Sequence, residues 1–248
     1  MRLITLQTQH TTYQMGVNDL GFLLHLYYGP KADGDMSWLL TGYDRGFSGN
    51  PYDAGDDRTF SLDVVPLEYP CYGSGDFRSP AFNIRNSRGV FGADLRFRQY
   101  DVISGKYSIP GLPNVYADDK DAYTVEVVLA DKASGVEVVL KYGVLPKLDA
   151  ITRSAVVRNR GNQTIYIDKA GSACLDFLSG DYDLLHFYGR HAMERNLERV
   201  PLIHGRQDFS SRRGTSSHQH NPFFILADRE TTEDYGSCYG MMLLYSGN

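Results

Sequence analysis

The hydrophobic and polar positions of this chain follow the two-residue period of β-strands along most of its length. The alternation is clearest at 123–130 and 136–142, two runs joined by the short polar stretch 131–135. Residues two positions apart lie on the same face of a strand, so each run can bury one face and expose the other. These two runs are therefore predicted to form an antiparallel hairpin with Gly135 in its loop.

Other short apolar runs of the same kind recur, with glycine- and asparagine-containing turns between them. No window sustains the spacing of an amphipathic helix, and the best helix candidate, Ala192–Leu197, is too short to be stable as one. Strands at intervals of about a dozen residues indicate an all-β fold, a large antiparallel β-sandwich. The further predicted strands are 2–7, 12–17, 22–28, 82–84, 95–103, 151–158, 164–174, 222–226 and a strongly apolar one at 238–245.

Two long stretches interrupt this pattern. Residues 42–57 are rich in glycine and aspartate, and residues 66–80 are rich in proline and glycine. Loops of this length are uncommon inside a compact domain and are usually functional. We therefore expect one or both to carry a functional site.

Composition narrows the class of protein. The chain has 248 residues, of which 42 % are hydrophobic, enough for one large β domain spanning 1–248 rather than a disordered segment. The net charge of -5, with both signs mixed along the chain, argues against a nucleic-acid partner. No apolar run approaches the ~20 residues of a membrane span. Three widely spaced cysteines, an odd number, indicate reduced thiols and a cytoplasmic location.

The stretch 206–221 concentrates the groups most capable of site chemistry: three arginines, two histidines and several hydroxyls. His218 and His220 have the spacing of a zinc-binding pair, and His204 or Asp208 could supply a third ligand. The same histidines could instead hydrogen-bond the backbone of a loop at the mouth of a sheet. Sequence alone does not choose between these interpretations.

Acidic residues offer weaker hypotheses. Asp53, Asp56 and Asp57 could bind calcium, but their spacing is not that of an EF-hand and acidic loops are usually solvated. No nucleophile elbow and no phosphate-binding glycine loop is present, so neither catalytic nor cofactor residues are predicted from motifs. A further set of aspartates could form the carboxylate pair of a glycosidase, although turn and capping roles suit them better: Asp131, Asp149, Asp176, Asp181 and Asp183.

Four motifs, with the ending 244–248, together resemble a known family, the N-terminal domain of the α-galactosidases of glycoside hydrolase family 36. The similarity covers nearly the whole chain and is weakest over the first forty residues. The motifs are DRTFSLD at 57–63, EYP to DFR with a following PA at 68–81, ITRS at 151–154, and SRRG to SHQHNP at 211–222.

This resemblance implies a β-supersandwich of the galactose-mutarotase-like type, preceding a (β/α)₈ barrel that performs the chemistry. Such enzymes hydrolyse terminal α-1,6-galactosides such as melibiose and raffinose with retention of configuration and without a cofactor. Retention requires two carboxyl groups ~5–5.5 Å apart. In the family both are aspartates of the barrel, which this chain lacks, so the chain is expected to contain no catalytic residue and to be inactive alone. A core strand so close to the last residue also suggests a piece of a longer polypeptide.

The resemblance further implies an accessory role. In tetrameric members a loop of this domain reaches a neighbouring subunit's active site, and the matching positions here are Asp44 and Arg58. A carboxylate and a guanidinium suit charge-assisted hydrogen bonds to sugar hydroxyls, although the two could also form a local surface pair. His191 matches a position where some members carry a sugar-stacking tryptophan. The resemblance places Arg212, Arg213 and other groups of 206–221, including His218, at the interface with the barrel.

Two rival hypotheses belong to other classes. The chain could be a free-standing carbohydrate-binding or assembly module, in which loop aromatics such as Trp38, Tyr43 and Tyr52 would bind sugar. It could also be a metalloenzyme centred on His218 and His220. The expected partners under the main hypothesis are the catalytic barrel, further copies of the same chain and α-galactoside sugars.

Overall fold

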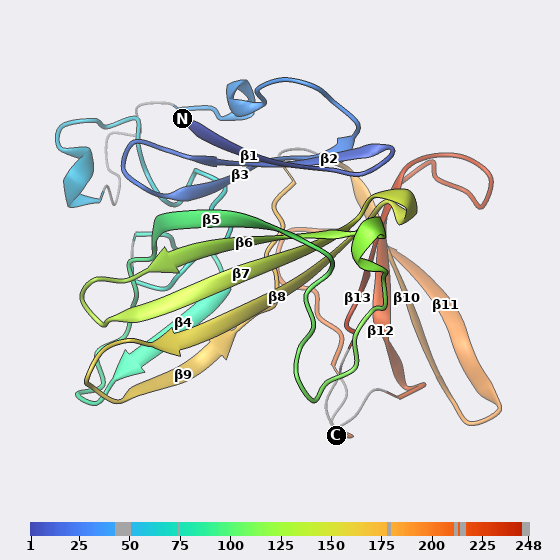
Figure 1. Cartoon of the computed structure of the whole chain (residues 1–248). Helices are drawn as coiled ribbons and strands as arrows, with labels where there is room; N and C mark the ends of the chain where they lie inside the picture. Colours follow the sequence, from blue (N-terminus) through green and yellow to red (C-terminus); the bar gives the residue numbers. More distant parts are fainter. Residues whose placement is uncertain (43–50, 74, 178–179, 211–212, 214–216, 245–248) are drawn as a thin grey trace. The chain divides into compact units, whose positions relative to one another are not determined.

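The computed structural model describes residues 1–42, 51–73, 75–177, 180–210, 213 and 217–244. The chain divides into two compact units, one formed by 1–107 and 116–177 and the other by 108–115 and 178–248. Each unit is built of antiparallel sheets (Figure 1). The predicted all-β, antiparallel sandwich class is confirmed, while the single domain over 1–248 stays a prediction.

The first unit contains three sheets (Figure 1). Strands β1 (Arg2–Gln7), β2 (Thr11–Val17) and β3 (Leu23–Pro30) form one of them in sequence order. The two-stranded sheet pairs β4 (Phe82–Asn86) with β9 (Ile165–Ala170). The third sheet runs β5-β6-β7-β8, with bounds Arg96–Ser104, Tyr123–Ala130, Val136–Leu145 and Ala150–Asn159.

The core of this unit lies between the inner faces of its sheets. Every second residue of β6 and β7 is buried there, as the alternation predicted, and meets the inward side chains of β1 and β2. The burial of such side chains is the main favourable term in folding. The fully buried members include Leu6, Met15, Val127, Val138 and Tyr142.

Strand β3 is buried on both faces, and this places the loop that follows it. Leu23 belongs to the main core, whereas Leu24 and Leu26 point the other way into a second cluster with Phe22, Leu62 and Leu67. Backbone hydrogen bonds join the two segments, from His25 N to Pro66 O at 2.7 Å and from Glu68 N to Leu23 O at 3.0 Å. Residues 58–67 therefore cover the outer face of β3.

The second unit is a four-stranded sheet in the order β11-β10-β12-β13, with bounds Met193–Pro201, Tyr182–Arg190, His220–Asp228 and Cys238–Met242. Strand β12 confirms the apolar strand predicted after the polar stretch 206–221. The stretch Ala192–Leu197, judged too short to be a stable helix, forms none: residues 193–197 enter β11, where Leu197 pairs with Phe187 of β10. A cross-strand ladder satisfies their backbone groups, which so short a helix could not do.

Two predictions need correction. We predicted no strand at 182–190, yet β10 is an inner strand of this sheet, paired with β11 on one side and β12 on the other. The predicted buried strand at 238–245 is an edge strand that ends at Met242, whose side chain is 61 % exposed. Among the described residues it pairs with β12 alone.

Short 3-10 helices connect the strands: η1 (Ser37–Leu39), η2 (Tyr52–Ala54), η3 (Asp119–Asp121) and η4 (Pro146–Leu148). Within the described residues, no helix has the length and apolarity that crossing a bilayer requires. No disulfide joins the three cysteines, all of which lie in the described part of the chain: Cys71 is buried, Cys174 is half-buried and Cys238 is exposed.

Candidate functional site

The segment 51–65 of the first unit carries Arg58, one of the three predicted sugar contacts. It begins with the 3-10 turn η2 and continues through a second turn in which Asp57 Oδ1 accepts hydrogen bonds from the backbone N (2.9 Å) and hydroxyl (2.6 Å) of Thr59. These hydrogen bonds lower the pKa of Asp57. Arg58 lies inside this turn and is exposed at the surface of the unit.

Apolar side chains fasten the middle of this segment to the unit. Leu62 is fully buried among the residues on the outer face of β3, and Phe60 stacks on Phe22 with 5.9 Å between ring centroids. Burying a leucine side chain stabilises a fold by about 1.5–3 kcal/mol. The backbone that carries Arg58 is thus held by its C-terminal neighbours.

The other two predicted sugar contacts give different outcomes. Asp44 lies outside the described residues. His191 belongs to the second unit, where it occupies the turn between β10 and β11 with an exposed side chain, next to Ala192 at φ 62°.

The histidine-rich stretch 206–221 lies in the second unit and is described in part. Ser217 and His220 form an isolated bridge at the start of β12, and His218 is exposed. The ring of His220 lies 6.4 Å from that of His186 on β10, and His186 contacts Phe209 at 4.4 Å. The second histidine of the motif therefore packs beside another strand, an arrangement that the sequence interpretation of a His218–His220 pair did not foresee.

No group of three or more His, Cys, Asp or Glu side chains suited to a metal ion occurs in the described part of the chain. Asp53 pairs with Arg96 at 3.0 Å, while Asp57 caps its own turn. The aspartates weighed as a glycosidase pair have structural partners as well. Asp131 and Asp149 have the turn and capping roles favoured from sequence, whereas the other three form ion pairs with arginines. Their contacts are Asp131 with Ser134, Asp149 with Thr8 and His10, Asp176 with Arg78, Asp181 with Arg229, and Asp183 with Arg199.

A buried polar network that sequence analysis did not predict lies in the core of the first unit. Glu68 has a side chain with no exposed surface, and Arg153 Nη2 lies 2.7 Å from its Oε1. Tyr13 donates to both carboxylate oxygens at 2.6 and 2.8 Å, and Tyr142 donates to Oε1 at 2.7 Å. His25 Nδ1 lies 3.2 Å from Oε2. Glu68 is thus surrounded by partners on both oxygens.

Electrostatics explain how this charge tolerates burial. Burial alone would raise the pKa of Glu68, but the Arg153 charge and hydrogen bonds from His25 and Tyr13 lower it below its usual value. Burial raises the pKa values of Tyr13 and Tyr142 strongly, although the Arg153 charge opposes this, so both remain hydroxyl donors. Because both carboxylate oxygens of Glu68 already accept hydrogen bonds from the protein, none is left to bind a ligand. The network is therefore structural.

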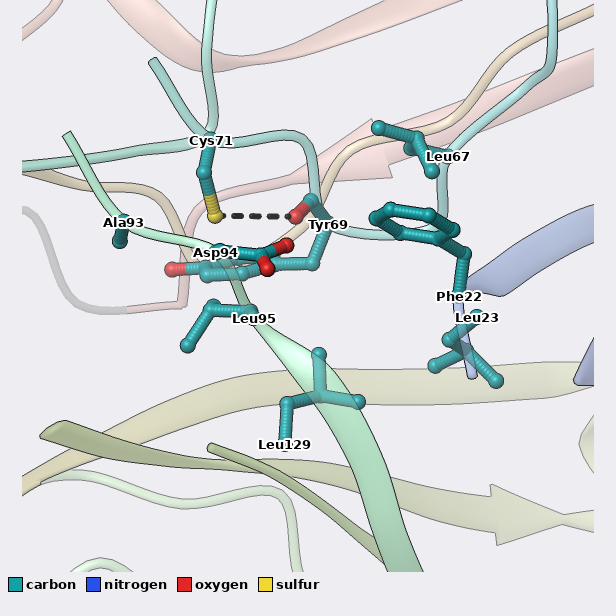
Figure 2. Close-up of a pocket in the computed structure, with 9 residues that line it drawn as sticks. All are labelled: Phe22, Leu23, Leu67, Tyr69, Cys71, Ala93, Asp94, Leu95 and Leu129. Carbon is teal, nitrogen blue, oxygen red and sulfur yellow. Dashed lines mark hydrogen bonds between the residues drawn. The ribbon is translucent and has the colours of Figure 1, made fainter. Parts of the chain in front are cut away.

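A small cavity lies beside this core (Figure 2). Its volume is about 20 Å³, which suits one water molecule, whereas small-molecule sites occupy about 300–1,000 Å³. The Cys71 thiol donates a weak hydrogen bond to Tyr69 O at 3.6 Å, and burial raises its pKa. The cavity is therefore too small for a sugar; it is lined by Phe22, Leu23, Leu67, Tyr69, Cys71, Ala93, Asp94, Leu95 and Leu129.

A comparison with protein families shows the family of the chain. The glycosyl hydrolase family 36 N-terminal domain matches residues 21–248. The chain belongs to this family. Two of its motifs meet in the buried network, since Glu68 comes from EYP and Arg153 from ITRS. The signal was therefore in the sequence, but nothing in it indicated that the two residues pair.

Curated relatives of this family 36 domain are longer proteins. The bifunctional α-galactosidase/sucrose kinase AgaSK of Mediterraneibacter gnavus is 60 % identical over 247 residues, which are 100 % of this chain and 26 % of that protein. α-Galactosidase AgaA of Geobacillus stearothermophilus is 41 % identical over 98 % of this chain and 33 % of its own length. The chain thus spans between a quarter and a third of these relatives.

Solved structures show the same fold. The galactosidase domain of AgaSK superposes with a TM-score of 0.95 at 60 % identity, covering 99 % of this chain and 34 % of that one. A variant of Geobacillus stearothermophilus AgaA in complex with raffinose gives 0.94 at 39 % identity, with coverage of 99 % and 34 %. The family 36 domain described here is accordingly the β-sandwich that these proteins carry at their N-terminal end.

Proposed function

We propose that this chain is the non-catalytic N-terminal domain of an α-galactosidase that hydrolyses terminal α-1,6-galactosides, such as melibiose and raffinose, with retention. The observation that carries the proposal is its match to the N-terminal portion of proteins named α-galactosidases. The relative solved with raffinose, and another variant solved with stachyose, support the substrate class. The two catalytic carboxylates then reside in the portion of the polypeptide that the relatives have in addition.

An activity assay tests this division of labour. The 248-residue chain and the full-length polypeptide that contains it are incubated with raffinose and with 4-nitrophenyl α-galactoside, and released galactose and nitrophenol are measured. Turnover is expected for the full-length polypeptide only. Appreciable hydrolysis by the 248-residue chain would overturn the claim that the chemistry lies elsewhere.

Within the full-length enzyme, we propose that Asp44, Arg58 and His191 contact the substrate bound by a neighbouring subunit. The position of Arg58, an exposed residue on a turn whose backbone is held by Asp57, supports this role, because a positioned donor loses little freedom when it binds a hydroxyl. Arg58→Ala is expected to raise KM for raffinose about tenfold or more. An unchanged KM would remove Arg58 from the site.

This role requires assembly, so we propose a cytoplasmic homo-oligomer, a tetramer in the full-length enzyme. The three free thiols agree with a reducing compartment. Sedimentation equilibrium of the full-length enzyme tests the tetramer, and dilution to the monomer should raise KM together with the loss of the neighbour's Arg58. A monomer with undiminished activity would contradict the shared site.

A second candidate function is a free-standing carbohydrate-binding module. It is favoured by Tyr52, which is 99 % exposed on η2, and by Trp38, which is 72 % exposed, since exposed aromatic rings can stack on sugars. Titration calorimetry of the 248-residue chain with raffinose distinguishes the two. Saturable binding lost in Tyr52→Ala would support the module, and no heat of binding would eliminate it.

A further inference from the structure

Two arginines, Arg78 and Arg96, contact opposite ends of the segment 51–65. At its C-terminal end, Arg78 uses all three guanidinium nitrogens. Nε and Nη2 donate to the two carboxylate oxygens of Asp76 at 2.9 and 2.7 Å, and Nη1 donates to Asp176 at 2.8 Å. Nη2 also donates to the backbone oxygens of Val65 at 2.8 Å and Leu62 at 3.4 Å. One side chain thus ties the end of this segment to two other stretches of the first unit.

The contact with backbone oxygens matters because it does not depend on the side chains of the segment. The amides of Val64 and Val65 both donate to Ser61 O at 3.3 Å, so residues 61–65 form a tight turn. Arginine donors at the last carbonyls of such a turn resemble a C-terminal helix cap. The planar fork of guanidinium reaches these acceptors together, which the single ammonium of lysine cannot do.

At the N-terminal end, Arg96 of β5 holds the 3-10 turn. Its Nη1 lies 3.0 Å from Asp53, while Nε lies 2.6 Å from Asp94 and Nη1 donates to Leu20 O at 2.6 Å. The guanidinium lies 3.8 Å from the centre of the Phe22 ring, whose other contacts include the ring of Phe60. Arg96 is only 19 % exposed, so its position is well fixed.

We propose that Arg78 and Arg96 are positioning residues that hold the segment 51–65 so that Arg58 is presented to the substrate. The inference rests on the proposed substrate contact of Arg58 and adds the residues that set its geometry. Misplacing a binding group by about 1 Å can cost about 10²-fold in rate. The arginines therefore act on the substrate through Arg58, without touching it themselves.

A first experiment measures how strongly Arg78 stabilises the backbone of residues 61–65, without any catalysis. Hydrogen exchange of peptides covering 58–67 is compared for the 248-residue chain and its Arg78→Lys variant. Lysine keeps the positive charge but lacks the planar set of guanidinium donors. Exchange in 61–65 is expected to accelerate about tenfold or more. Arg85→Lys is the matched control, since Arg85 pairs with Asp168 and stacks on Tyr166 in the β4-β9 sheet. Unchanged exchange in Arg78→Lys would overturn the proposal.

A second experiment separates positioning from general stability in the full-length enzyme. Arg78→Lys and Arg96→Lys should each raise KM for raffinose about tenfold while changing kcat less than about threefold. In an Arg58→Ala background the same substitutions should have no further effect on KM, because they act through Arg58. Equal losses in both backgrounds would overturn the proposal. Wild-type KM in Arg58→Ala alone would instead refute the substrate contact, a result that the exchange experiment does not depend on.

One variant guards against a folding defect. Should Arg78→Lys unfold, Asp176→Asn removes a single partner of Arg78 and leaves its contacts with Asp76 and the two carbonyls. It is expected to accelerate exchange in 61–65 by a smaller factor than Arg78→Lys would. Equal exchange in Asp176→Asn and the parent chain, with Arg78→Lys unfolded throughout, would count against a specific grip.

Discussion

Replacing Arg153 by methionine tests the buried network of the first unit most directly. The substitution keeps a long side chain in the core but removes the only arginine that contacts Glu68 among the described residues. Glu68 then keeps two tyrosine hydroxyls and His25 as partners, but no arginine charge balances its carboxylate. Methionine also gives up the contact of the guanidinium with the Tyr142 ring, 4.4 Å from its centroid.

The size of the effect follows from the distance and the burial. At 2.7 Å and an effective dielectric constant of about 20, two unit charges attract by about 6 kcal/mol. Desolvation of both groups offsets much of this in the wild-type chain, but after the substitution Glu68 stays buried and loses the attraction. Removing one partner of a buried pair costs about 3–5 kcal/mol, a large part of the about 5–15 kcal/mol that stabilises an ordinary domain.

The pH dependence of stability provides a second, independent test of the network. In the wild-type chain the pKa of Glu68 is lowered by Arg153, so its contribution to stability is present above the unfolded pKa of about 4.3 and is lost as pH falls. Without Arg153, burial dominates and raises the pKa of Glu68. The variant should then lose stability as pH rises through that raised value, the opposite direction.

Urea unfolding at pH 3, pH 5 and pH 7 measures both effects, since the wild-type loss lies below the unfolded pKa of about 4.3. Trp38 is the one tryptophan of the chain and lies in the first unit, so its fluorescence follows that unit. Arg85→Met removes an exposed pair and should cost less than about 1 kcal/mol. If Arg153→Met were no worse than Arg85→Met, or shared the pH trend of the wild type, the reasoning about the network would be wrong.

The remaining predictions concern single sites. Leu62→Ala should destabilise the first unit by about 2–5 kcal/mol because the side chain is fully buried, and urea unfolding with a loss below about 1 kcal/mol would contradict its anchoring role. A thiol reagent should label Cys238 first and the two less exposed cysteines only on unfolding, since burial raises the pKa of both; three equally fast thiols would refute this order. Hydrogen bonds from Thr8 and His10 lower the pKa of Asp149 to about 2, so this carboxylate stabilises the fold above its unfolded pKa and loses the effect as pH falls toward 2. Asp149→Asn should accordingly flatten the fall of Tm between pH 4 and pH 2, and an unchanged fall would assign it to other groups.

The local pattern of the chain determined the parts of the fold that depend on short-range physics. The hairpin of β6 and β7 follows from apolar residues at every second position on either side of a glycine-containing turn, because side-chain direction in a strand has a period of two. The motif that contains Arg58 was also visible in the sequence. The Asp57 cap of its turn joins residues only two positions apart, whereas the rest of the segment is held by distant side chains.

Contacts between distant segments were decided only by the tertiary structure. Polar and aromatic residues interrupt the apolar pattern of Tyr182–Arg190, so its place as an inner strand of its sheet comes from pairing with β11 and β12. Glu68 and Arg153 meet because residues 66–68 pair with β3 while β8 pairs with β7. The grip of Arg78 on Leu62 and Val65 likewise depends on how separate stretches pack. The order of residues in the sequence does not give the distances between remote segments. Only folding brings these charged groups within hydrogen-bonding distance.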